Sequence, residues 1–84
     1  MTKPIRRYKI VDLCDLNKIQ AICIELSMSE REFMRLATQP IQSQDDFTVD
    51  QLEIIAAVLD VKLIDLFSHE YIEWKVNHWF DRIF

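Results

Sequence analysis

Three stretches of the chain repeat apolar residues at spacings of three and four, the period of an amphipathic helix. The first follows Asp15 and runs to about Leu26, the second runs from Glu30 to about Thr38, and the third begins after Thr48. The positions expected on the buried faces are Leu16, Ile19, Ile22, Cys23 and Leu26; Phe33, Met34 and Ala37; and Val49, Leu52, Ile55, Ala56 and Leu59. The pattern predicts three helices packed around one small core.

Local signals set the ends of these helices. Asp15 and Thr48 are suitable N-caps, with Asp12 an earlier candidate for the first helix, and Ser29 with Glu32 three residues later forms a capping-box pattern. Pro40 disfavours helical geometry in the residue before it and so ends the second helix. After a turn at residues 60–62, we expect Leu63, Leu66 and Phe67 to close the domain with one more short helical turn.

The two ends of the chain are less clearly patterned. Residues 5–11 are β-branched and aromatic with charges between, which predicts a short extended segment or a basic tail. Residues 68–84 fit two periods. A helix after Ser68 would align Ile72, Val76, Trp79, Phe80 and Ile83, whereas a strand would align Ile72, Trp74 and Val76 and could pair with residues 5–11. The length of the segment and its lack of Gly and Pro favour the helix.

Composition agrees with a single helical domain. The 84 residues include no Gly, and half are apolar, which suits helices joined by short polar turns. We expect a mostly all-α bundle of four to five helices, divided into a basic arm or short strand (1–12), a helical domain (13–67) and an aromatic extension (68–84). No apolar run reaches the roughly 20 residues of a membrane helix, and no secretory signal is visible, so we expect a cytoplasmic protein.

Two segments together carry a resemblance to a known family. "MSEREFMRLA" followed by "FTVDQLEIIAAVLDVKLIDLF" resembles the lambda-repressor/Cro family of helix-turn-helix domains, over about Leu16 to Phe67. The second segment is the more specific match, and its apolar residues stand where that family packs its fourth and fifth helices. The resemblance implies a small dimeric transcription regulator that reads DNA with a recognition helix.

The chain departs from that family where the recognition helix should lie. Helix-turn-helix domains of this family place about sixteen residues between the second helix and the residue before the cap of the fourth. The equivalent stretch here, Thr38 to Asp46, has nine residues and ends in two aspartates. Glu30 also replaces a common Gln that touches phosphate, and Cys23 replaces a common Arg. We expect "TQPIQSQDD" to be a connecting loop, the alternative being a short helix with Pro40 in its first turn.

Charge bears on the same question. The net charge is -4, yet the first nine residues carry four positive charges and no negative one, so the other 75 sum to -8. Because duplex affinity comes mainly from cations that neutralise phosphate, an acidic body disfavours DNA. The candidate DNA contacts are Lys3, Arg6, Arg7 and Lys9 in the arm and Gln39, Gln42, Ser43 and Gln44 in the loop.

The aromatic C-terminus is the other candidate site. Residues 68–84 hold more than half of the nine aromatics, and aromatic residues are concentrated at interface hot spots. We expect a homodimer or a tight complex with another protein, through Tyr71, Trp74, Trp79, Phe80 and Phe84. The alternative is that these rings complete the core of a monomer.

No catalytic constellation, metal site or cofactor motif can be assembled, so we do not expect an enzyme. Cys14 and Cys23 are too far apart on one helix for a disulfide, and are best read as buried reduced thiols. His69 and His78 have no paired nucleophile. Two functions remain open. One is a non-enzymatic regulator on a degenerate helix-turn-helix fold that binds protein, including by mimicking DNA. The other is a DNA-binding regulator with a shortened recognition segment.

Overall fold

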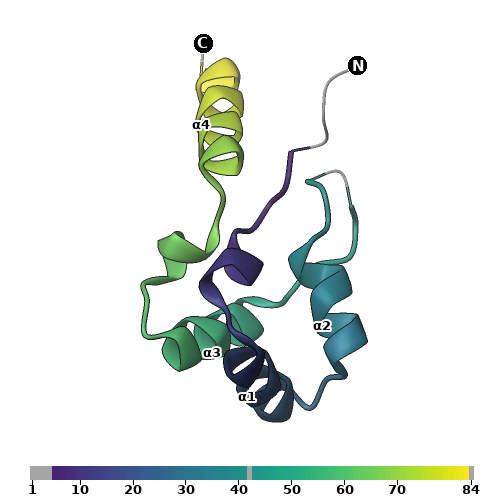
Figure 1. Cartoon of the computed structure of the whole chain (residues 1–84). Coiled ribbons are helices and arrows are strands. Elements are labelled where there is room, and N and C mark those ends of the chain that lie inside the picture. The colour runs from purple at the N-terminus through teal and green to yellow at the C-terminus, as the bar shows by residue number, and fades with distance from the viewer. Residues whose placement is uncertain (1–4, 42, 84) are drawn as a thin grey trace.

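The protein is mostly helical. The computed structural model describes residues 5–41 and 43–83, with the backbone alone described for residues 78–83. In chain order the elements are a short 3₁₀ helix η1 (Ile10–Leu13), α1 (Leu16–Leu26), α2 (Glu30–Ala37), α3 (Val49–Leu59), a second 3₁₀ helix η2 (Leu63–Leu66) and α4 (His69–Ile83). Figure 1 shows α1, α2 and α3 gathered at one end of the molecule and α4 extending from the other.

The predicted helix starts are confirmed. The side chain of Asp15 accepts a hydrogen bond from the Lys18 amide at 2.8 Å, and Ser29 accepts one from the Glu32 amide at 3.1 Å. At Thr48 the capping box is complete, because the Gln51 side chain accepts from the Thr48 amide in return. The box expected at Ser29 is only half formed, since the Glu32 carboxylate turns to Arg35 instead.

Two helices end without glycine. Ser27 after α1 and Asp60 after α3 adopt the left-handed conformation, with φ of 53° and 55°. Glycine usually takes this position, because a Cβ atom makes the conformation costly. Both residues use their amide to satisfy carbonyls of the preceding turn. These backbone hydrogen bonds therefore stabilise the two turns in the absence of glycine.

The core lies between α1, α2, α3 and η2. Ile22, Phe33, Ile55 and Leu66 are fully buried, and Leu59, which the spacing also placed inward, is partly buried against them. Leu16 and Val49 differ from expectation: they are 62% and 63% exposed. Each is the first residue of its helix.

The N-terminal segment is built into the body. Residues 5–9 run extended between the loop after α2 and the chain after η2, with single antiparallel bridges from Arg6 to Pro40 and from Tyr8 to Phe67. Tyr8 is 4% exposed and belongs to the core. The expectation of an extended segment is confirmed as far as residue 9, and the chain then turns into η1 rather than continuing to residue 11.

The C-terminal segment is a helix, and the strand alternative is wrong. Ser68 ends the extended stretch that runs beside residues 5–9, and its hydroxyl accepts a hydrogen bond from the Tyr71 amide at 3.0 Å. This is the predicted cap. The Ser68 hydroxyl also donates to the Arg6 carbonyl, which joins the start of α4 to the N-terminal segment. In the described part of the chain, no helix is both long and apolar enough to cross a membrane.

Candidate interaction surfaces

The stretch between α2 and α3 is a loop. From Thr38 to Thr48, leaving aside Gln42, which lies outside the described residues, no residue is helical. The loop is tied down at both aspartates. Asp46 forms an ion pair with Arg7 at 2.9 Å, and Asp45 forms one with Arg35 at 3.0 Å. We call residues 39–47 the clipped loop.

The side chain of Arg7 anchors the clipped loop. It is only 13% exposed, and besides the Asp46 carboxylate it donates hydrogen bonds to the carbonyls of Ile41 and Ser43, at 2.9 and 3.3 Å. Asp46 in turn accepts from the buried Tyr8 hydroxyl and from the Phe47 amide. Burial and the bond to Asp46 raise the pKa of Tyr8 above its ordinary range. The cluster joins the N-terminal segment to the clipped loop, so its role is structural.

Arg35 of α2 anchors the clipped loop at Asp45. Its guanidinium bridges Glu32 in the same helix and Asp45 in the loop, and this pairing lowers the pKa of the Glu32 carboxyl. The Gln39 amide lies beside them. With its oxygen turned toward Arg35 Nη1 at 3.0 Å, its nitrogen donates to the Asp45 carbonyl at 2.6 Å. Both aspartates of the loop are therefore paired, Asp46 with Arg7 of the N-terminal segment and Asp45 with Arg35 of α2.

The candidate DNA contacts are distributed unevenly. Arg7 and Gln39 are engaged as described, Ser43 is half-buried, and Gln44 and Arg6 are exposed. Lys9 is half-buried, and its amide pairs with the Leu66 carbonyl at 2.9 Å. Lys3 and Gln42 lie outside the described residues. The structure thus leaves Arg6 and Gln44 as the most accessible of the described candidates.

A chain of aromatic contacts runs from the core to α4. Phe33 contacts Phe47, Phe47 contacts Tyr8, and Tyr8 contacts Phe67, with ring centroids 5.9, 5.7 and 5.3 Å apart. Phe67 then stacks on Tyr71 at 5.3 Å, and Tyr71 on Trp74 at 6.1 Å. The rings of Phe33, Phe47 and Tyr8 are buried. Phe67 is half-buried and connects them to Tyr71 and Trp74 on α4, which are half-exposed.

α4 is thinly covered. From His69 to Asn77, the part whose side chains are described, no residue of α4 is buried. Tyr71, Ile72 and Trp74 are half-exposed, and Val76 is 44% exposed. Of the five predicted interface residues, Tyr71 and Trp74 therefore lie on a solvent-facing helix, while the side chains of Trp79, Phe80 and Phe84 lie outside the described part.

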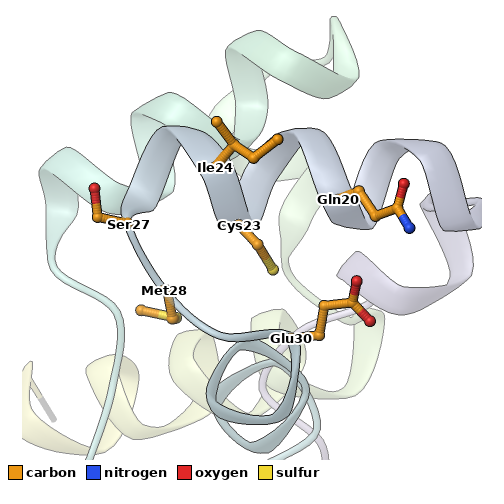
Figure 2. Close-up of a pocket in the computed structure, with 6 residues that line it drawn as sticks. All are labelled: Gln20, Cys23, Ile24, Ser27, Met28 and Glu30. Atoms are coloured by element: carbon orange, nitrogen blue, oxygen red, sulfur yellow. The ribbon is translucent and has the colours of Figure 1, made fainter.

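A shallow hollow opens where α1 meets α2. Figure 2 shows it lined by Gln20, Cys23, Ile24, Ser27, Met28 and Glu30, with Cys23 pointing toward the start of α2 and Ile24 pointing away from it. Cys23 and Glu30 therefore lie together in the lining of this hollow.

The chemistry of this hollow is limited. Burial raises the pKa of the Cys23 thiol, and the Glu30 carboxylate raises it further, so the thiol stays protonated at neutral pH. The pKa of Cys14 is raised for the same first reason. A protonated thiol is a poor nucleophile and a poor metal ligand. Among the residues described, no group of three His, Cys, Asp or Glu side chains is placed to hold a metal ion.

Sequence reasoning missed the link between the N-terminus and the loop. A basic segment and a pair of aspartates some 38 residues later are compatible charges, yet no periodicity connects them. Comparison with protein-family models, with curated proteins and with solved structures finds no match to this chain. The surfaces described above are therefore the basis for assigning a function.

Proposed function

We propose that this chain is a non-enzymatic regulatory protein on a degenerate repressor-like helix-turn-helix fold, and that it acts by binding protein through α4. The observation that carries the proposal is the exposure of that helix. α4 extends away from α1, α2 and α3 (Figure 1), with Val76 44% exposed and no described side chain buried. Isolated helices of about 15 residues are marginal in water, so packing against a partner would stabilise it.

The anchoring of α4 supports this role. The Ser68 cap, its bond to Arg6 and the stacking of Phe67 on Tyr71 fix where the helix begins. A binding helix with a fixed base loses less conformational entropy on association than one on a free linker. Tyr71 and Trp74 add the amphipathic ring surface that interface hot spots favour.

The clipped loop and the α1–α2 side of the molecule are poorly suited to binding DNA. The clipped loop lies where the family that the chain resembles carries its recognition helix, and two arginines bonded to this loop, Arg7 and Arg35, are already paired with aspartates. Cys23 and Glu30 offer no cation to phosphate on the α1–α2 side. Because phosphate neutralisation supplies most of the affinity for duplex DNA, these features favour a protein partner over an operator.

The test compares two neighbouring positions on α4. Val76→Glu places a charge on the apolar face, whereas Asn77→Glu adds the same charge one residue away at an exposed polar position. We expect the wild type and Asn77→Glu to retain a bound partner protein, and Val76→Glu to lose it. Extracts are treated with nuclease before purification, so that contacts bridged by nucleic acid are removed.

A different result would favour the DNA-binding alternative. Selection from a random duplex library that recovers a two-fold symmetric site, with recognition weakened by Gln44→Ala, would replace the protein partner by an operator. Each lost Gln–adenine contact would then cost about 1–3 kcal/mol at one base position.

A further inference from the structure

The seam between α1 and α3 carries an apolar surface that the proposed function does not use. Ala21, Ile24, Ile54, Ala57 and Val58 line an open hollow there, with Glu25 at its edge. Ile24 is 76% exposed, the highest value among the large apolar side chains described. It also borders the hollow of Figure 2, so it protrudes between two concave apolar areas.

Two charges flank this surface along α1. Lys18 and Glu25 are seven residues apart, which is two helical turns, so they lie on one side of the helix about 10 Å apart along its axis. Lys18 reaches across the seam, and its Nζ donates to the Val58 carbonyl at 3.3 Å. Glu25 is exposed and forms no ion pair with any residue the structure describes.

These charges are placed against the dipole of their own helix. Lys18 stands in the first turn of α1, where an acidic residue is favoured, and Glu25 stands in the last turn, where a basic one is favoured. The other two main helices of the body follow the rule, with Glu30 and Glu32 at the start of α2, Arg35 at its end and Asp50 at the start of α3. The order of charges on α1 therefore needs an explanation outside the helix.

We propose that the α1–α3 seam is a self-association surface whose occupant is a second copy of this chain, with the two α1 helices antiparallel. A two-fold axis midway between residues 18 and 25 places Lys18 of each copy against Glu25 of the other. The same operation directs Ile24 of each copy toward the apolar hollow of the other, where Ala21 and Ala57 are small enough to admit it. The protruding Ile24, the hollow and the two charged residues lie on one patch. An isologous interface needs such a patch, because the same surface of each copy must be complementary to itself.

The inference goes beyond the proposed function, because α4 remains free to bind elsewhere. It also explains the reversed charges of α1, since each would meet its opposite across the interface. Glu25 thereby gains a partner that it lacks among the residues the structure describes.

The decisive experiment exchanges the two charges. Lys18→Glu alone places two acidic side chains together at both symmetric contacts, and Glu25→Lys alone does the same with two basic ones. We expect each single variant to weaken dimerisation in sedimentation velocity by roughly tenfold or more, because each substitution acts twice in a symmetric dimer. The double variant Lys18→Glu with Glu25→Lys restores opposite charges at both contacts and should dimerise like the wild type.

Two further variants separate this surface from α4. Ile24→Glu should leave only monomer, whereas Val76→Glu should leave the dimer intact even where it abolishes partner binding. Thermal melts followed by circular dichroism check folding, and the charge variants should be no less stable than the wild type because they agree with the helix dipole. A wild type that stays monomeric at several hundred micromolar, or a double variant as weak as either single one, would overturn the inference. So would a dimer that dissociates with Val76→Glu and ignores the charge exchange, an outcome that would still support the role of α4.

Discussion

Tyr8 illustrates how a residue in a basic segment can serve the core. Its ring contacts Phe47 and Phe67, and its hydroxyl donates to the Asp46 carboxylate, which Arg7 also holds. Buried polar groups are tolerated when they are bonded in this way. The arginine, the aspartate and the phenol thus act as one structural unit. From sequence alone Arg7 is expected to be exposed, because no local pattern indicates that Asp46, 39 residues later, is its partner.

The ionisation of Tyr8 predicts how stability depends on alkaline pH. Burial, followed by the bond to Asp46, raises the pKa of Tyr8 above the ordinary value of 10.0. The stabilising contribution is therefore complete below pH 10 and is lost as the pH rises toward the folded pKa, because only the unfolded chain ionises in that range. We expect the free energy of unfolding to fall above pH 10 by about 1.4 kcal/mol per pH unit from this group.

The comparison uses urea unfolding at pH 8 and pH 11. Tyr8→Phe keeps the ring and removes the ionisable group, so its loss of stability over that interval should be smaller than that of the wild type. Tyr71→Phe is the matched control, since its ring lies on the half-exposed face of α4. Equal losses in wild type and Tyr8→Phe would show that Tyr8 does not contribute.

Among the elements, the helices were predicted well because their signals are local. Caps at Asp15, Ser29, Thr48 and Ser68 are each set within three residues, and all four form as expected. The errors occur where neighbours decide the outcome. Leu16 and Val49 satisfy the helical period yet are exposed, and Leu36 and Phe47 are buried without having been assigned to the core. The spacing of apolar residues predicts which face of a helix is buried. It does not predict how much of that face the neighbouring elements cover.

This difference between period and coverage gives a prediction for α3. Leu52 is 6% exposed and Val49, on the same expected face, is 63% exposed. Leu52→Ala removes buried methyl groups and leaves a cavity, so it should lower the free energy of unfolding by about 2–5 kcal/mol. Val49→Ala should change it by less than about 0.5 kcal/mol. Urea midpoints measure both, and similar losses for the two variants would contradict the assigned core.

The candidate sites were less predictable than the fold. Tyr71 and Trp74 were identified by aromatic content, and the structure places both on an exposed helix. The clipped loop was expected as a connection, but its two ion pairs join segments far apart in the chain and leave no trace in local spacing. The α1–α3 seam was missed because Ile24 and Ala21 read as ordinary positions beside a predicted core stripe.

At the scale of the molecule, residues 5–9 carry structure as well as charge. They hold Tyr8, two bridges and several backbone bonds to the loop and to the base of α4. Deleting residues 1–9 should therefore remove cooperative unfolding, because losing a buried aromatic alone costs about 3–5 kcal/mol in a domain of marginal stability. Thermal denaturation followed by circular dichroism measures this directly.

The matched control keeps the backbone and removes charge. Full-length chain with Arg6→Gln and Lys9→Gln should melt close to the wild type, since Arg6 is exposed and the bonds described for both residues are made by their backbone. A truncated chain that melts like the wild type would show that the segment is dispensable. A loss of DNA binding after truncation would report unfolding, so the charge variants are the appropriate probe of an electrostatic role.

The placement of residues 5–9 has a consequence for how the chain reaches its native state. α1 and α3 already pack across separations such as the 40 residues between Lys18 and Val58, and the Ser68 hydroxyl bonds a carbonyl 62 residues earlier. Tyr8 cannot be enclosed until Phe67 has been synthesised, so a nascent chain holds Tyr8 without this partner until the segment after η2 has been made. Contacts of such separation slow folding relative to a bundle of local helices. The insertion of residues 5–9 thus depends on the segment after η2, and it fixes the base of α4 in the same step.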